Sequence, residues 1–226
     1  MFSILKQLAS MFSLPTLLEL KRIHYSRQIK TNNFGAGEKE YDLLSTWLTE
    51  GDWVIDVGAN IGQYTKKMSD LVGNTGRVIA FEPILETFYL LAANTNKFIN
   101  KFNISLFNAA ISDSTVVLGM DIPQSTTGLN NYYQAHLVES NTAHSVLCIP
   151  LDHFDFPKNI KLVKIDAEGH ELHVLKGMKN LISRDHPVLI VEDHGKDVEE
   201  FLINQFGYNR EKLENSPNII FTYNMD

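Results

Sequence analysis

Two acidic residues and two glycines in the first half of the chain have the spacing of a nucleoside-binding site. Asp56, Gly58 and Gly62 follow an apolar run that begins at Trp53, and Glu82 comes twenty residues after Gly62. Glycines let the backbone pass close to a ligand, and the helix that follows them offers free amide groups. A carboxylate at the end of the next strand can accept both hydroxyls of a ribose. The pattern therefore predicts that these residues bind a nucleoside.

The same loop differs from the fingerprint of nicotinamide dinucleotide enzymes, because Asn60 and Gln63 stand where that fingerprint has glycine. A sulfonium-bearing amino acid needs an acid near its cation and amides near its carboxylate, and this loop offers both. We add Asn60, Tyr64 and Asn108 to the candidate cofactor-binding residues, with Asn108 at the position of an adenine contact. The alternatives are that the glycines and Asn108 only form turns and that Glu82 caps a helix.

Acidic and imidazole side chains gather after the fourth and fifth predicted strands, namely Asp166, Glu168 and His170 after the fourth and Glu192 and His194 after the fifth. Where the substrate is an alcohol, which is a weak nucleophile, its reaction needs a base or a metal to draw off the proton. His194 is the best base candidate, with Asp166 or Glu192 to orient it. Asp166 with Glu192 could equally bind Mg²⁺, and the sequence does not choose between a base and a metal.

The first candidates for catalysis are thus Asp166, His194 and Glu192, without an assigned metal ligand. Glu168 and His170 are candidates for substrate binding because they follow the fourth predicted strand at the carboxyl edge of the sheet. The alternative for Glu168 is a structural role, because the first turn of a helix favours acids.

The elements that carry these residues alternate along the chain. Apolar runs predict strands at 53–57, 77–81, 104–107, 161–165 and 188–191. Helical patterns follow the first two of them, over residues 63–72 and 85–98. Such alternation is typical of an α/β fold with a mostly parallel, doubly wound sheet and helices on both faces. Ligands of such sheets lie beyond the carboxyl ends of the strands, where all the candidate residues stand.

Residues 114–156 break this alternation and predict a β-rich insertion before the fourth strand. Residues 116–120 and 145–149 have the pattern of strands, with a long polar loop between them. A long excursion from a compact domain is commonly functional, so we interpret the loop as a lid or a substrate-recognition element. Tyr132 and Tyr133 in this loop could stack on a ring of the substrate or anchor the loop to the domain.

The composition is that of one globular domain, with 44% apolar and 21% charged residues among 226. The net charge of −7 argues against a nucleic acid partner. The single cysteine, Cys148, excludes an intramolecular disulfide and a cysteine-based metal cluster, and favours a reducing, cytoplasmic location.

We divide the chain into an N-terminal amphipathic helical segment, residues 1–37, and a domain over residues 38–226. The apolar stripe of the segment consists of Ile4, Leu5, Leu8, Met11 and Phe12. We favour packing of this stripe on the domain or on a second subunit of a homo-oligomer. The alternative is weak contact with a membrane surface, because basic residues follow between Lys21 and Lys30. No apolar stretch has the length of a membrane span.

Four segments of the sequence resemble the FkbM family of methyltransferases: residues 54–62, 80–83, 108–113 and 164–171. The most specific is Lys164-Ile165-Asp166-Ala167-Glu168-Gly169-His170-Glu171, followed by Leu175-Lys176-Gly177. The resemblance covers residues 38–194 and implies a Rossmann-like class I methyltransferase fold with S-adenosylmethionine as methyl donor. It also implies O-methylation, commonly of sugar hydroxyls or of secondary metabolites. Glu38 or Glu40 resembles the family's acid before the first strand, and we place Glu40 with the donor's amino group.

We therefore expect an S-adenosylmethionine-dependent O-methyltransferase whose acceptor is a hydroxyl of a sugar, a glycan or a glycosylated small molecule. An NAD(P)-linked oxidoreductase is disfavoured by Asn60 and Gln63. A non-catalytic nucleoside-binding scaffold is disfavoured because Asp166 and the cluster from Glu192 to His194 are both present.

Overall fold

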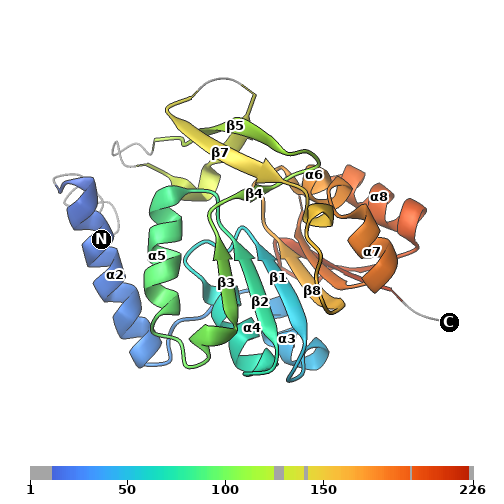
Figure 1. The fold of residues 1–226 in the computed structure, drawn as a ribbon, viewed down its shortest axis with the longest axis horizontal. Coiled ribbons are helices and arrows are strands. Elements are labelled where there is room, and N and C mark those ends of the chain that lie inside the picture. The colour runs from blue at the N-terminus through green and yellow to red at the C-terminus, as the bar shows by residue number, and fades with distance from the viewer. Residues whose placement is uncertain (1–11, 125–129, 140–141, 194, 224–226) are drawn as a thin grey trace.

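The computed structural model describes residues 12–124, 130–139, 142–193 and 195–223. Within them the chain forms a central sheet covered by helices on both faces, with a second, smaller sheet above one edge of the first (Figure 1). Residues 1–11, which carry most of the predicted N-terminal stripe, lie outside the described residues. None of the described helices has the length and apolar character needed to cross a membrane.

The central sheet has seven strands in the described residues. In sheet order they are β10 (Asn209–Glu211), β11 (Asn218–Thr222), β9 (Val188–Glu192), β8 (Ile160–Ile165), β1 (Trp53–Val57), β2 (Arg77–Phe81) and β3 (Ile104–Phe107). The five strands from β9 to β3 pair in parallel, and β10 and β11 run antiparallel at the edge. The predicted doubly wound, mostly parallel sheet is therefore confirmed.

The inner strands are apolar over almost their whole length because both of their faces are covered. Val54 and Val78 pack on one face with Leu44 and Met68, whereas Ile55 and Ile79 pack on the other face. The helices are α2 (Leu14–Lys30), α3 (Lys39–Trp47), α4 (Gln63–Val72), α5 (Leu85–Thr95), α6 (Glu171–Lys176), α7 (Lys179–Asp185) and α8 (Lys196–Phe206). One face of the sheet carries α3, α4 and α5, and the other carries α6, α7 and α8.

The predicted insertion forms the second sheet. Its strands, in sheet order, are β4 (Ala110–Ile111), β7 (His144–Ile149), β5 (Val116–Asp121) and β6 (His136–Val138). Three short 3₁₀ helices complete the described elements, namely η1 (Lys101–Asn103), η2 (Tyr132–Gln134) and η3 (Leu151–His153). Because β4 begins three residues after β3 ends, the second sheet lies over the carboxyl ends of the parallel strands (Figure 1). It covers the edge where the sequence predicts the site.

The helix α2 packs lengthwise on α5 at one side of the molecule (Figure 1). Tyr25 and Ile29 of α2 contact the cluster of Phe34, Leu90 and Phe98. The described part of the N-terminal segment thus contributes to the packing of the domain.

Candidate active site

The turn between β1 and α4 is fixed by two glycines with positive φ. Gly58 has φ +74°, and a Cβ there would lie 1.8 Å from the carbonyl oxygen of Asp166. Gly62 has φ +94°, and its Cβ would lie 2.7 Å from the side chain of Leu91. Positive φ favours glycine at both positions, and at Gly58 any other residue would also force the backbone of Asp166 to move. The missing side chain of Gly58 therefore lets the end of β1 approach the end of β8.

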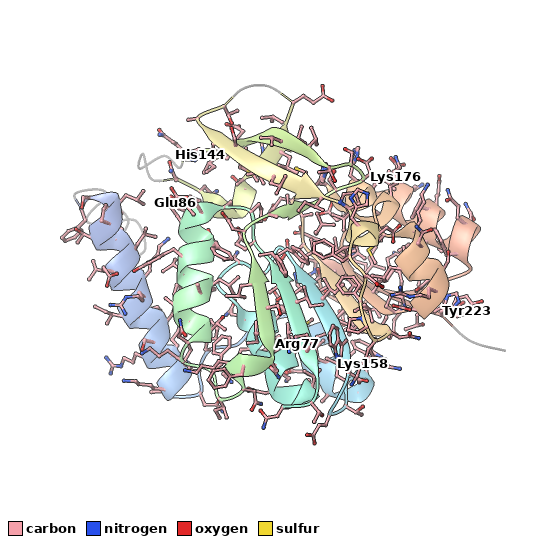
Figure 2. The ribbon with its side chains drawn as sticks, viewed as in Figure 1. Arg77, Glu86, His144, Lys158, Lys176 and Tyr223 are labelled. Carbon is pink, nitrogen blue, oxygen red and sulfur yellow. The ribbon has the colours of Figure 1, made fainter. Side chains whose placement is uncertain are left out.

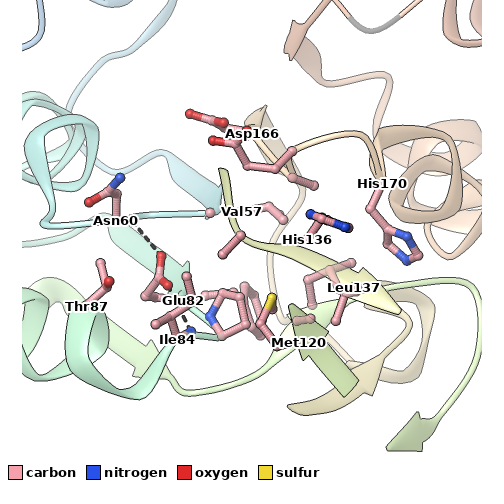
Figure 3. A pocket seen from close by; sticks show the side chains of 18 of the residues that line it. Val57, Asn60, Glu82, Ile84, Thr87, Met120, His136, Leu137, Asp166 and His170 are labelled. Atoms are coloured by element: carbon pink, nitrogen blue, oxygen red, sulfur yellow. Dashed lines mark hydrogen bonds between the residues drawn. The ribbon is translucent and has the colours of Figure 1, made fainter. Parts of the chain in front are cut away.

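Glu82 lies at the end of β2 and is only 4% exposed. Its two carboxylate oxygens accept hydrogen bonds from the amides of Asn60 (2.9 Å) and Ile84 (2.9 Å), as Figure 3 shows. Burial raises the pKa of Glu82 to about 7, and the nearby charges of Asp166 and Asp56 act in the same direction. These bonds hold the carboxylate beside the glycine turn, where the sequence predicts a ribose.

Asn108 fixes the turn after β2. Its Nδ2 donates to the carbonyl oxygens of Glu82 (2.9 Å) and Pro83 (3.0 Å). It lines a neighbouring pocket next to the second sheet, of about 610 Å³ including open space. Asn108 thus stabilises the turn, and it is not among the residues that line the pocket around Glu82.

A pocket of about 670 Å³, partly open to solvent, lies between the carboxyl ends of the strands and the second sheet. Its polar lining from the central sheet consists of Asn60, Glu82, Asp166, Glu168 and His170. The opposite wall comes from the insertion and consists of Met120, Tyr132, Ala135, His136 and Leu137. We call this cavity the insertion-side pocket, and Figure 3 shows it from close by.

A second pocket, of about 720 Å³ including open space, adjoins the first and is mostly polar. Its titratable lining residues are Glu38, Asp56, Tyr64, Lys164, Asp166, Glu168 and Glu192. We call it the acidic pocket. Asp166 and Glu168 line both pockets, so a ligand that spans the two would pass these side chains.

Several buried side-chain oxygens of the acidic pocket have no hydrogen-bond partner among the described residues. They include Oε2 of Glu38, Oδ1 of Asp56, which is a fully buried side chain, and the hydroxyl of Tyr64, which is 7% exposed. The other oxygen of Asp56 accepts a 2.6 Å bond from Thr65, and burial raises the pKa of Asp56. Buried polar atoms are rarely left unpaired, so this pocket has room and acceptors for a polar, cationic group.

Lys164 supplies the positive charge of this region. It is 3% exposed, its Nζ lies 2.8 Å from Asp166 Oδ2, and it lies 4.8 Å from the centre of the Tyr64 ring. Burial lowers the pKa of Lys164, but the charges of Asp166 and Asp56 outweigh burial and raise it overall. The ammonium group therefore stays charged and holds the carboxylate of Asp166.

Glu192 ends β9 and lies beside Asp166 and Glu168. One oxygen of each of these three side chains lies within 4.8 Å of the others. Burial raises the pKa of Glu192 to about 8, and the charges of Asp166 and Glu168 raise it further. A carboxyl group that exchanges its proton near neutral pH suits general base catalysis. The same three carboxylates also have the chemistry of a hard divalent cation site.

His170 lines the insertion-side pocket through a network that reaches the surface. Its Nε2 lies 2.9 Å from Ser112 Oγ, and its ring stacks on His173 at 4.5 Å. His173 in turn lies 2.9 Å from Asp113. Burial lowers the pKa of His170 to about 4, so its ring is neutral at physiological pH and can bind a hydroxyl group as donor or acceptor.

Glu40 lies outside both pockets, contrary to the assignment made from the sequence. It is fully buried, and it accepts hydrogen bonds from Ser216 Oγ (2.8 Å) and Asn218 Nδ2. It therefore ties α3 to the start of β11. Glu38, the other acid considered at this position, lines the acidic pocket instead. His194 lies outside the described residues.

Sequence reasoning missed the contribution of Lys164 and His136. Lys164 interrupts the buried run of β8, and a lysine at such a position is unusual enough to signal an ion pair. His136 lines the insertion-side pocket from β6, a strand that lies in the segment predicted as a loop. Tyr132 also lines this pocket, and Lys21 of α2 lies 5.7 Å from its ring, so Tyr132 also anchors the insertion.

Comparisons with known proteins define the class first. The fold matches a methyltransferase FkbM from Methylobacillus flagellatus with TM-score 0.56 and 16% identity, over 78% of this chain and 44% of that one. It also matches a precorrin-6y C5,15-methyltransferase from Geobacter metallireducens with TM-score 0.51 and 15% identity, over 84% and 90% of the two chains. The chain has the class I methyltransferase fold, as the sequence predicted.

The sequence itself then identifies the family. Residues 56–215 match the methyltransferase FkbM domain. The hexuronic acid methyltransferase AglP of Haloferax volcanii is 32% identical over 168 residues, which are 71% of this chain and 65% of that protein. The chain thus spans slightly less than two thirds of that relative. It belongs to the FkbM methyltransferase family, and this membership supports S-adenosylmethionine as its methyl donor.

Proposed function

We propose that this chain transfers the methyl group of S-adenosylmethionine to an oxygen atom of a sugar. The observation that carries the proposal is the shared wall of the two pockets. Asp166 and Glu168 line both of them, whereas Glu82, the candidate for binding the ribose, lines the insertion-side pocket and Glu192 lines the acidic pocket. The name of the relative from Haloferax volcanii supports a sugar acceptor.

The donor fits the residues that are present. Glu82 would accept the ribose hydroxyls, and the glycine turn lets a ligand approach the backbone closely. The unpaired Oδ1 of Asp56 and the hydroxyl of Tyr64 would receive the donor's ammonium group, with Glu38 in place of the predicted Glu40. When bound, the donor supplies an electrophilic methyl group on a positively charged sulfur, which an acidic pocket favours.

The acceptor would enter between the second sheet and the carboxylates. Its hydroxyl oxygen forms a bond to the methyl carbon, the carbon–sulfur bond breaks with its electrons left on sulfur, and the hydroxyl proton passes to a base. Glu192 and Asp166 are the described candidates for that base, and His194 remains the candidate predicted from the sequence. Glu168, His170 and Tyr132 would contact the sugar.

The direct test combines donor binding with transfer. Calorimetry with S-adenosylhomocysteine measures the donor site, and labelled S-adenosylmethionine with a panel of hexosides and hexuronides measures transfer. We expect binding, and transfer to at least one sugar. Tight binding without transfer to any acceptor would instead support the non-catalytic scaffold, and absence of binding would contradict the whole proposal. Repeating the active reaction with EDTA tests whether the three carboxylates need a divalent cation.

A further inference from the structure

Two acid-free stretches of the chain lie side by side on the surface. Residues 20–37 and 87–112 contain no Asp or Glu, although the whole chain has 27 acidic residues and a net charge of −7. Their lysines and arginines are Lys21, Arg22, Arg27, Lys30, Lys97 and Lys101, of which Arg22 pairs with Glu19 just before the first stretch (2.6 Å). Because α2 packs along α5, these stretches meet at one side of the molecule (Figure 1).

The turn after α5 carries the most exposed large apolar side chains of the described residues. Ile99 is 87% exposed and Phe102 is 85% exposed, whereas the neighbouring Phe98 is buried. Lys97 and Lys101 alternate with them along the turn, and Lys101 Nζ lies 5.2 Å from the Phe102 ring. The exposed apolar residues are therefore interleaved with positive charge.

This turn is held firmly from beneath. Asn103 is 3% exposed, and its Nδ2 donates to the carbonyl oxygens of Ser69 (3.0 Å) and Gly73 (2.7 Å). Arg77, labelled in Figure 2 at the same end of the sheet, donates to the carbonyl oxygen of Phe102 (3.2 Å). A fixed backbone that holds Ile99 and Phe102 in solvent costs free energy unless something covers them.

The exposed face of α2 also combines apolar and basic side chains. Ile23 is 60% exposed and Leu20 is 49% exposed, while Arg27 and Lys30 lie exposed toward the C-terminal end of the helix. Tyr25 and Ile29, on the opposite face, pack against the cluster that contains Phe98. These contacts place the C-terminal half of α2 next to the turn. We call residues 97–102 together with the exposed face of α2 the basic apolar patch.

We propose that the basic apolar patch docks on a lipid bilayer that carries anionic headgroups. Ile99 and Phe102 would enter the interface between headgroups and acyl chains, and the lysines and arginines would contact the headgroups. A second copy of this chain fits less well, because a two-fold contact would bring the same basic residues together. The turn precedes β3 and so lies at the amino ends of the parallel strands, which leaves both pockets uncovered.

The test uses the full chain and flotation with vesicles. One set contains phosphatidylcholine alone and the other contains equal parts of phosphatidylcholine and phosphatidylglycerol. We expect binding to the anionic vesicles and a loss of about tenfold or more in the variant Ile99→Ser/Phe102→Ser. The matched control is Val117→Ser/Leu147→Ser, which removes two exposed apolar side chains from the second sheet.

A second pair of variants tests the contribution of the lysines to binding of the anionic vesicles. Lys97→Glu/Lys101→Glu should weaken binding about tenfold, because each lysine near an anionic surface contributes. Lys176→Glu/Lys179→Glu makes the same charge change at exposed sites of α6 and α7, on the other face of the sheet from α5 (Figure 1), and should bind like the unaltered chain. Equal binding to both vesicle sets, no binding, or wild-type binding by the Ile99→Ser/Phe102→Ser variant would overturn the proposal. The proposal would also be overturned if the unaltered chain formed a dimer in solution and the Ile99→Ser/Phe102→Ser variant were a monomer.

Discussion

Glu82 makes the most specific contribution of a single residue, because one buried carboxylate organises the turn and would also bind the donor. We predict that Glu82→Ala weakens the binding of S-adenosylhomocysteine by about 1–3 kcal/mol, the range of a lost hydrogen bond to a charged group. Calorimetry on the folded variant measures the change. Glu211→Ala, at an exposed position of β10, is the control. Unchanged affinity in Glu82→Ala would remove the ribose role.

The raised pKa of Glu82 gives a second prediction at this scale. Between pH 4.5, its ordinary pKa, and about pH 7, the folded protein keeps a proton that the unfolded chain releases. The folded state then binds more protons than the unfolded state, so the free energy of unfolding falls as the pH rises, by up to about 1.4 kcal/mol per unit. Glu82→Gln cannot titrate and should lose this slope.

Urea denaturation of the protein without donor, at a series of pH values, measures that difference. Parallel curves for the two proteins would show that Glu82 has an ordinary pKa. The affinity for S-adenosylhomocysteine should change in the opposite sense and improve as the pH rises through about 7, because the ionised carboxylate accepts hydrogen bonds from both ribose hydroxyls.

The candidate bases can be separated by substitution. We predict that Glu192→Gln or His194→Ala, whichever removes the true base, slows turnover about 10²- to 10⁴-fold with little change in donor affinity. Initial rates and calorimetry on the same preparations distinguish the two effects. If both variants keep the normal rate, either Asp166 accepts the proton or a cation held by the carboxylates activates the hydroxyl group. The reaction with EDTA distinguishes these two cases.

The sequence predicts which residues end the strands, and the structure shows Asp166, Glu168 and Glu192 together, as that rule requires. The sequence could not show which of Glu38 and Glu40 lines the acidic pocket. The two are close in sequence, and the difference depends on the contact of Glu40 with β11, about 180 residues away.

At the scale of elements, the turn after β1 is the feature on which the site depends most. Gly58→Ala would place a Cβ 1.8 Å from the carbonyl oxygen of Asp166 and at a positive φ. We predict a loss of at least about 2 kcal/mol of stability, as in overpacked cores, together with weaker donor binding, because β1 and β8 must move apart. Thermal denaturation and titration with S-adenosylhomocysteine measure both.

Gly37→Ala is the matched control for this prediction. A Cβ at Gly37 meets nothing within 4 Å, so this variant should fold and bind like the unaltered chain. Equal behaviour of the two variants would show that the backbone of the turn can shift at little cost, and that the close approach of β1 and β8 is not required.

The apolar runs predict the five parallel strands well, because strands buried on both faces leave a strong local signal. They do not predict β6, whose three residues are exposed or half-buried, or the pairing that brings His136 to the pocket. The helix after β2 was predicted to reach residue 98 but ends at Thr95. The apolar Phe98 packs in the core from the following turn, and the periodicity cannot separate these cases.

At the scale of the whole molecule, charge is divided between two regions. The carboxyl ends of β1, β2, β8 and β9 bring Asp56, Glu82, Asp166 and Glu192 to one edge of the sheet. Residues 20–37 and 87–112, in and after α2 and α5, contain no acidic residue and carry six lysines and arginines. This division suits a protein that receives a cationic donor at one place and, by our inference, meets an anionic surface at another.

Lys164 supplies positive charge among the carboxylates at the carboxyl ends of the parallel strands. It is the one cation other than histidine among the described residues that line the two larger pockets, and it links β8 to α4 through Asp166 and the ring of Tyr64. Lys164→Met keeps the length of the side chain but leaves buried carboxylates without their partner. We predict a loss of about 3–5 kcal/mol in the free energy of unfolding at pH 8.

The loss should shrink at pH 5, because protonated carboxyl groups need no partner. Lys161→Met, three residues earlier on β8 at an exposed position, is the control and should lose little. Urea denaturation at both pH values measures the four free energies. A Lys164→Met protein as stable as Lys161→Met at pH 8 would mean that the acidic edge already holds protons there. The buried ion pair with Asp166 would then not stabilise the arrangement of the site.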